Sequence, residues 1–186
     1  MSMVVNRRDL DFILYETLDL ESVLQSDRYA DYDRESLDAM LDLCQTIAED
    51  QFLPCAGELD ANEPKFVDGK VETIPELKEA INAYQAAGLC TSAYDLEIGG
   101  MQLPWMVDQA LNGMFVCANN PAHMYLFLTQ GVANMLDACG SRELKDKYLP
   151  NLVEGKWFGT MCLSEPQAGS SLADIRTKAE LNADGS

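Results

Sequence analysis

An apolar run at residues 157–163, followed by a proline and a glycine-serine turn, limits the possible folds of this chain more than any other feature. The run suits a buried β-strand and is built from Trp157, Phe158, Met161, Cys162 and Leu163. A buried strand must pair its backbone groups, and partner strands are not evident in the residues before it. We therefore expect this strand to begin a β-structure that continues beyond the chain, which makes the chain the N-terminal part of a longer protein.

The residues before this run are predicted to form a helical body. Their apolar residues recur at helical spacing, and proline, glycine and capping residues mark the ends of each segment. The expected helices cover about residues 8–18, 33–52, 75–88, 104–117, 121–139 and 141–155, with a small hairpin at 66–71. The helix at 121–139 is apolar nearly all round, so we expect it to be central and buried. The fold class is therefore mainly α, with the first strand of a β-domain at the end.

A turn with free backbone amides is expected directly after the strand. Pro166 ends the strand, and Gly169-Ser170-Ser171 forms a flexible corner edged with hydroxyl groups. Because Gly169 has no side chain, backbone amides there can approach a phosphate closely. Ser164, at the end of the strand, could donate a hydrogen bond to a flat polar ligand. An ordinary surface turn fits the same residues.

The charge balance excludes several classes of partner. The chain has 31 acidic and 13 basic residues, a formal net charge of −18. Nucleic acids and anionic membrane surfaces need basic patches, so neither is an expected partner. No apolar run approaches the roughly 20 residues of a membrane span. The polar start predicts no signal peptide, and the six cysteines contain no Cys-x-x-Cys pair, so we expect reduced thiols and a cytoplasmic location.

The sequence shows no catalytic triad, metal site or dinucleotide motif. His123 is the only histidine and lies on the most apolar predicted helix, where a structural role is expected and a metal site is not. No Gly-x-Gly-x-x-Gly or Gly-x4-Gly-Lys-Ser/Thr sequence occurs, which argues against a Rossmann or P-loop site.

The strand and turn resemble a known signature. Leu163-Ser164-Glu165-Pro166 and Ala168-Gly169-Ser170 resemble the flavin-binding signature of acyl-CoA dehydrogenases, in which an aspartate usually follows. Here Ser171 takes that place. The resemblance extends upstream to Tyr148-Leu149-Pro150, Gly155-Lys156 and Ile98-Gly99-Gly100, although Met101-Gln102 replaces a second family glycine. The extended start is similar to a larger-subunit branch of this family.

This resemblance implies a domain organisation and a chemistry. Residues 1–155 would form the family's N-terminal helical domain, and 156–186 the truncated start of its middle β-domain, with 182–186 as a hairpin tip. In that family, FAD accepts a hydride from the β carbon of an acyl-CoA thioester while a glutamate base removes the α proton. The base lies in a C-terminal bundle, so the resemblance implies no catalytic residue in this chain, and we expect the chain alone to be inactive.

The resemblance also implies positions for the cofactor and the substrate. Met161, Leu163 and Ser164 would lie at the isoalloxazine edge of FAD, with Cys162 beside them. Gly169 and Ser170 would lie at the pyrophosphate, and Ser170 could also reach the CoA part of the substrate. Tyr125, Leu128 and Thr129 could line the acyl pocket, although their apolar spacing also suits plain core positions.

Two other functions remain open at this point. An acyl-CoA oxidase has the same fold but passes its electrons to oxygen, and a non-enzymatic helical binding module could keep the fold without the chemistry. For a dehydrogenase, the resemblance implies electron-transfer flavoprotein as the acceptor and a homo-oligomer when the protein is full length. The intact Ser-Glu-Pro…Gly-Ser turn favours the enzyme over the binding module.

Overall fold

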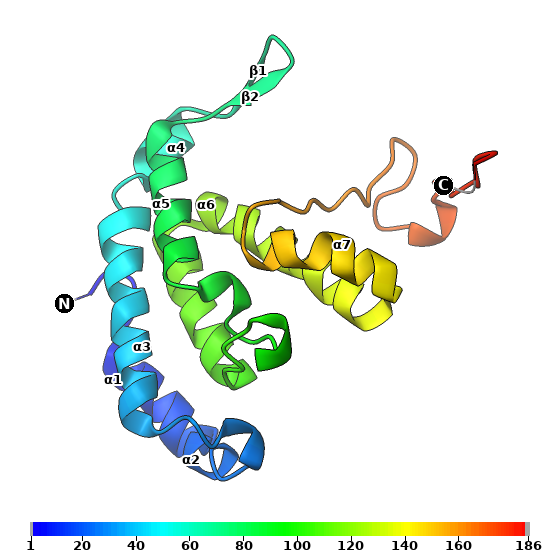
Figure 1. The fold of residues 1–186 in the computed structure, drawn as a ribbon. Coiled ribbons are helices and arrows are strands. Elements are labelled where there is room, and N and C mark those ends of the chain that lie inside the picture. Colours follow the sequence, from blue (N-terminus) through cyan, green and yellow to red (C-terminus); the bar gives the residue numbers. More distant parts are fainter. Residues whose placement is uncertain (1, 185–186) are drawn as a thin grey trace.

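Three long helices form the body of the protein in a computed structural model that describes residues 2–184 (Figure 1). α3, α5 and α6 lie side by side, and α7 packs against the C-terminal half of α6. The elements in chain order are α1 (Arg7–Asp11), α2 (Leu20–Val23), α3 (Arg34–Ile47), α4 (Ala56–Ala61), β1 (Lys65–Val67), β2 (Lys70–Glu72), α5 (Pro75–Ala86), α6 (Trp105–Cys139) and α7 (Arg142–Val153). The mainly α prediction is confirmed.

Helix ends follow the local signals in the sequence. Asp33 caps α3 in a capping box, in which its side chain accepts from the backbone of Ser36 and the Ser36 hydroxyl bonds back to Asp33. Pro75 opens α5, where its missing N–H costs nothing. Gly88 follows α5 with φ +73°, a backbone conformation that favours glycine. Ser141 caps α7 through the amide of Leu144.

An aromatic cluster forms the centre of the core. The ring of Phe115, on α6, lies edge-on to Phe52 and Tyr84, with centroid distances of 4.9 and 4.8 Å. Phe52 follows α3, and Tyr84 belongs to α5, so the cluster joins the three long helices. Such pairs contribute about 0.5–1.5 kcal/mol each beyond the burial of their area.

α6 is broken at Asn119, where the backbone leaves the helical region with φ −160° and ψ 88°. The sequence predicts two helices here, separated by a turn at 119–121, and the break lies at that position. The Asn119 side chain accepts from the amide of Ala122 at 3.1 Å and donates to the Phe52 carbonyl at 3.1 Å. It therefore caps the second half of α6 and holds it to the residues after α3.

The second half of α6 is less buried than predicted. Phe127 and Met135 are more than half exposed and mark a face that the other described elements leave open. An apolar helix is buried on all sides only where other elements cover every face. In the described residues, nothing covers this face.

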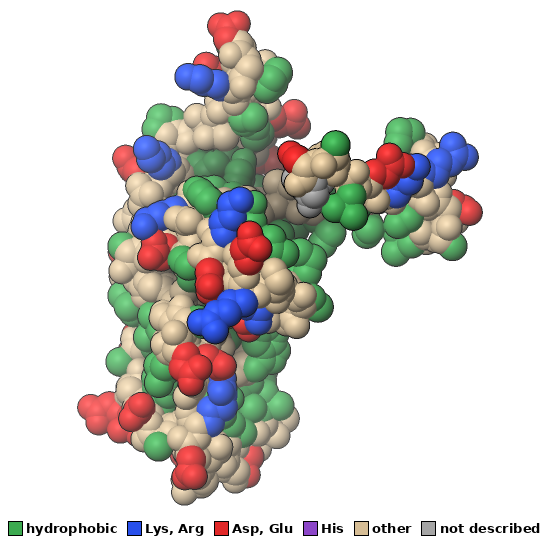
Figure 2. All heavy atoms as spheres, turned by 45° about the vertical axis from the view of Figure 1, so that its right-hand side comes forward, with side chains coloured by type: hydrophobic (Ala, Val, Ile, Leu, Met, Phe, Trp, Pro, Cys, Tyr) green, Lys and Arg blue, Asp and Glu red, His purple; other side chains and the backbone are tan. Residues whose placement is uncertain are grey.

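The strand predicted at 157–163 does not form. The segment is extended, and the exposed fractions of Trp157, Phe158, Met161 and Leu163 lie between 46% and 67%, so the prediction of a buried strand is wrong for this chain. A strand needs a neighbour for its backbone groups, and the described residues provide none here. The segment instead carries the C-terminal turn away from the helical body, as the projecting arm in Figure 2 shows.

The predicted hairpin at 66–71 does form. β1 and β2 pair antiparallel through Phe66↔Val71, and Asp68 and Gly69 take positive φ in the turn. The hairpin projects from the end of the body near α4 (Figure 1). The second predicted hairpin tip, at 182–186, extends into residues 185–186, which lie outside the described residues. No helix between residues 2 and 184 is long and apolar enough to cross a membrane.

Candidate functional site

An open apolar groove of about 680 Å³ runs between α5 and the second half of α6. Its apolar wall consists of Leu77, Ile81, Met124, Tyr125, Leu128 and Phe158. Polar side chains lie at its margin, namely Thr73, Lys78, Asn82, Gln85 and Thr160. A concave apolar surface with a few polar groups suits the alkyl part of an amphipathic ligand.

Two of the three residues predicted to line an acyl pocket lie in this groove. Tyr125 and Leu128 contribute to its wall from α6. Thr129 does not: it borders a separate cavity of only about 10 Å³ behind the groove. Its hydroxyl donates to the Tyr125 carbonyl at 2.6 Å and accepts from the Gly159 amide at 3.0 Å. The structure thus places Thr129 between α6 and the segment that crosses it.

That crossing segment, residues 155–160, forms one side of the groove. Phe158 packs edge-on against Tyr125 with a centroid distance of 6.3 Å, and Trp157 lies against Tyr148 of α7. Gly159 lies so close to α6 that an added Cβ would meet the Val132 side chain at 2.6 Å. The sequence analysis missed these contacts, since nothing local indicates which helix the segment crosses.

The residues predicted to contact a cofactor follow the crossing segment directly. Met161, Cys162, Leu163 and Ser164 lie in the extended stretch and are exposed. Thr160, which precedes them, lines the end of the groove. The residues predicted to contact a cofactor therefore begin where the groove ends, and their side chains remain accessible to a ligand.

Glu165 organises the turn that comes next. Its carboxylate accepts from the amides of Arg176 at 2.9 Å and Thr177 at 2.8 Å, and from the hydroxyl of Thr177. The Thr177 hydroxyl and these two amides, together with Gln167, lower the pKa of Glu165 to about 2. Glu165 thus closes the loop up to Arg176 and Thr177 and has a structural role, a pairing that the sequence analysis did not identify.

The corner at 169–171 has room for an anion. Gly169 and Ser170 are exposed, and a Cβ added to Gly169 would meet nothing within 4 Å. In the described part of the chain, the amides of Gly169, Ser170 and Ser171 make no hydrogen bond, so they are free to donate to a ligand. Gly169 does not take positive φ, so open space rather than backbone conformation is the property that suits a phosphate.

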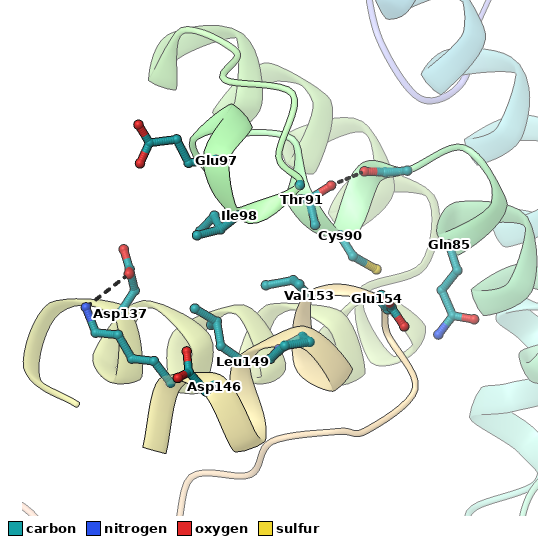
Figure 3. Close-up of a pocket in the computed structure, with 14 residues that line it drawn as sticks. Gln85, Cys90, Thr91, Glu97, Ile98, Asp137, Asp146, Leu149, Val153 and Glu154 are labelled. Carbon is teal, nitrogen blue, oxygen red and sulfur yellow. Dashed lines mark hydrogen bonds and ion pairs between the residues drawn. The ribbon is translucent and has the colours of Figure 1, made fainter. Parts of the chain in front are cut away.

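A second cavity, of about 670 Å³, lies between the connection at 88–99, the end of α6 and α7 (Figure 3). Its apolar lining includes Cys90 and Ile98 on one side and Leu149 and Val153 on the other, and carboxylates lie around it. One of them, Asp137, pairs with Lys145 at 3.4 Å. No residue that the sequence predicted for a site lines this cavity, so it does not contribute to the candidate site.

His123 belongs to the core. It is 1% exposed, and its Nε2 lies 3.0 Å from the side-chain oxygen of Asn112. Burial lowers its pKa to about 4, so it is neutral at physiological pH. Among residues 2–184, no group of three His, Cys, Asp or Glu side chains is arranged to hold a metal ion.

Comparisons with known proteins identify the family of this chain. The family model described as "Acyl-CoA dehydrogenase, N-terminal domain" matches residues 34–156. A butyryl-CoA dehydrogenase of Syntrophomonas wolfei is 34% identical over 92% of this chain and 28% of its own length. A broad-specificity linear acyl-CoA dehydrogenase of Mycobacterium tuberculosis is 35% identical over 97% of this chain and 30% of its own length.

Solved structures show the same fold. The butyryl-CoA dehydrogenase of Megasphaera elsdenii matches with a TM-score of 0.67 and 21% identity, over 83% of this chain and 38% of the other. A chain from a study of the electron transferring flavoprotein of Acidaminococcus fermentans matches with a TM-score of 0.66 and 23% identity, over 82% of this chain and 38% of the other.

The chain spans less than a third of the length of the two curated relatives described above. The match to the family model covers well over half of this chain, and it coincides with the helical body that carries the groove. On these findings, the chain belongs to the acyl-CoA dehydrogenase family and contains the N-terminal helical domain of that family.

Proposed function

We propose that this chain supplies the helical part of the substrate and cofactor site in a flavin-dependent acyl-CoA dehydrogenase. One observation supports this proposal above all others. The apolar groove between α5 and α6 ends at Thr160, where the stretch 161–164 and the Ser-Glu-Pro-x-Ala-Gly-Ser turn begin. A site for an acyl chain and a site for a flavin therefore adjoin on one surface.

Each part of this surface has a proposed role. The groove residues Tyr125 and Leu128 hold the acyl chain, which binds by burial of its methylene groups at about 0.8 kcal/mol each. Met161, Cys162, Leu163 and Ser164 lie along the flavin ring, and the free amides of Gly169 and Ser170 bind its pyrophosphate. FAD, when bound, accepts the hydride in this reaction. Ser170 also reaches the CoA part of the substrate.

The boundary between the helical domain, residues 1–155, and the start of the β-domain, residues 156–186, is part of the proposal. The catalytic base and the rest of the flavin pocket lie outside this chain. We therefore propose that the isolated chain is inactive and binds FAD weakly, because partial contacts must still offset the cost of association. The whole protein is proposed to be a cytoplasmic homo-oligomer that passes electrons to electron-transfer flavoprotein.

The test uses the whole protein that contains this chain. It should purify with bound FAD, and acyl-CoA thioesters should bleach the flavin in the absence of oxygen. A protein without flavin, or a flavin that no acyl-CoA reduces, would reject the proposed function. Rapid reoxidation of the reduced protein by oxygen, without an electron-transfer flavoprotein, would identify an oxidase instead.

A pair of variants tests the groove. Leu128→Trp fills the groove, so it should raise KM for long acyl-CoA substrates at least tenfold, about the effect of two lost methylene contacts. Leu144→Trp makes the same change at an exposed position of α7, outside the groove. It should leave KM unchanged. An equal KM in both variants would show that the acyl chain lies elsewhere.

A further inference from the structure

We infer that Thr129 is a positioning residue that holds the crossing segment at a set distance from the acyl groove and thereby aligns the flavin-facing stretch with the substrate. The inference rests on the proposed function and adds to it a residue that lies in neither subsite. It replaces the role that the family resemblance suggested for Thr129, which was to line the acyl pocket.

The hydroxyl of Thr129 bridges two backbone groups. It donates to the Tyr125 carbonyl, one turn earlier on α6, at 2.6 Å. With its hydrogen placed there, the oxygen accepts from the Gly159 amide at 3.0 Å. Thr129 is 6% exposed, so water cannot easily replace either bond. The hydroxyl therefore connects the wall of the groove to the crossing segment through one atom.

The absence of a side chain at Gly159 makes this contact possible. A Cβ on Gly159 would lie 2.6 Å and 2.9 Å from two carbons of Val132, and 3.2 Å from the Leu128 carbonyl. Only glycine lets the backbone approach α6 closely enough for its amide to reach Thr129. Val132 lies one turn beyond Leu128 on the same helix, so the contact surface continues the wall of the groove.

The other end of the crossing segment is held by α5. The Gln85 amide donates to the Gly155 carbonyl at 2.6 Å, and Gly155 takes φ +71°. Gln85 also lines the groove. The segment is thus fixed at both ends, by α5 at Gly155 and by α6 at Gly159, and Phe158 packs on Tyr125 between them.

This arrangement determines where the next residues lie. Met161 follows Gly159 by two positions, and the described residues hold the stretch 161–164 by no other backbone bond to the helices. Release of Gly159 would therefore let the stretch move relative to Tyr125 and Leu128. A misplacement of about 1 Å between reacting groups can reduce a rate by about a hundredfold.

The first arm of the test examines the contact itself in the 186-residue chain, without cofactor. Thr129→Val keeps the shape but removes both bonds, so amide hydrogen exchange at Gly159, whose amide Thr129 binds, should rise roughly three- to tenfold. Thr129→Ser keeps the hydroxyl and should exchange like the wild type. Thr46→Val is the matched control, because Thr46 makes the same bond to the carbonyl one turn earlier, at 2.9 Å, and touches no crossing segment.

The second arm examines the consequence in the whole protein with FAD. Thr129→Val should slow flavin reduction at saturating acyl-CoA by roughly ten- to a hundredfold, with a much smaller change in KM. Thr129→Ser should restore the rate, and Thr46→Val should not change it. The visible circular dichroism of the bound flavin should shift in Thr129→Val alone.

The outcomes distinguish a failure of the positioning role of Thr129 from a failure of the proposed enzyme function. Unchanged exchange in Thr129→Val would overturn the inferred contact. Faster exchange with an unchanged reduction rate and flavin spectrum would overturn its role in alignment. If the wild-type whole protein binds no flavin, the proposed function fails and the alignment role fails with it, whereas the exchange arm still decides the contact.

Discussion

His123 and Asn112 face each other across the break in α6, with the imidazole Nε2 3.0 Å from the Asn112 side-chain oxygen. The Tyr84 hydroxyl donates to the same oxygen at 3.2 Å, and the Asn112 amide donates to Asp108 at 3.1 Å. The Ser92 hydroxyl completes this chain by donating to Asp108. A buried polar chain thus ties both halves of α6 to α5 and to the connection after it.

This placement of His123 predicts a pH-dependent stability. Burial lowers the pKa of His123 from 6.5 to about 4, and its Nδ1 has no partner among the described residues. Below about pH 6.5 the unfolded chain binds a proton that the folded chain does not. The free energy of unfolding should therefore fall by about 2 kcal/mol between about pH 7.5 and about pH 5.

Denaturant titration at several pH values checks this prediction, with His123→Gln as the comparison. Between about pH 7.5 and about pH 5, the free energy of unfolding of the variant should fall by about 2 kcal/mol less than that of the wild type. This difference does not depend on the stability of the variant at neutral pH. Burial raises the pKa of Asp108, so this group makes the folded state more stable as the pH falls. Because Asp108 is present in both proteins, it does not affect their comparison. Equal pH slopes for the wild type and His123→Gln would contradict the prediction.

Asn119→Ala should destabilise the chain by about 1–3 kcal/mol. The change removes the cap on the second half of α6 and leaves the Phe52 carbonyl without its 3.1 Å bond. Asn120→Ala alters the next residue, which is exposed, and should cost less than about 0.5 kcal/mol. Thermal or urea unfolding of the two variants would measure the difference, and equal stabilities would refute the capping role.

Glu165→Ala should loosen the turn without affecting the helices. The carboxylate accepts from the amides of Arg176 and Thr177, and these bonds close the loop. Without them, both amides should exchange as fast as those of an unfolded peptide, because nothing else in the described residues binds them. Hydrogen exchange followed by NMR would measure this effect. Glu35→Ala is the control, and protected amides at 176 and 177 in Glu165→Ala would contradict the prediction.

Gly169→Val should reduce FAD retention in the whole protein more than Ser171→Ala. A valine side chain would enter the open space beside the free amides of the corner, where we place the pyrophosphate. Ser171 already differs from the family signature, so its hydroxyl should matter less. Flavin-to-protein ratios after gel filtration would compare the two variants, and equal ratios would count against the phosphate corner.

The isolated chain should self-associate more strongly as salt increases. Met161 and Leu163 are exposed on a stretch with unpaired backbone groups, which can pair with another chain. The net charge of −18 keeps copies apart at low salt, but screening shortens its reach to about 8 Å at physiological ionic strength. Light scattering across a salt series would detect the association.

Two charge-matched variants assign the association to this stretch. Met161→Lys should abolish the rise with salt, whereas Met3→Lys, which changes an exposed methionine elsewhere, should not. If the chain stays monomeric at every salt concentration, the extended stretch does not pair with other copies and the prediction is wrong.

The sequence by itself determined the features that depend on neighbouring residues. The ends of α3, α5 and α7 follow from caps, proline and glycine, and the hairpin turn follows from Asp68-Gly69. The break in α6 also lies where Asn119-Asn120-Pro121 predicts it. These signals act within a few residues, so no knowledge of the fold is needed to interpret them. The family signature likewise depends on one short stretch.

Only the tertiary structure decided the features that depend on distant partners. The run at 157–163 has the composition of a strand, but a strand exists only with a neighbour, and the described residues offer none. Helical spacing places Thr129 near Tyr125 and Leu128, but whether it faces the groove or Gly159 depends on where the crossing segment packs. Glu165 finds Thr177 twelve residues later because the chain folds back there, a path that no local pattern specifies.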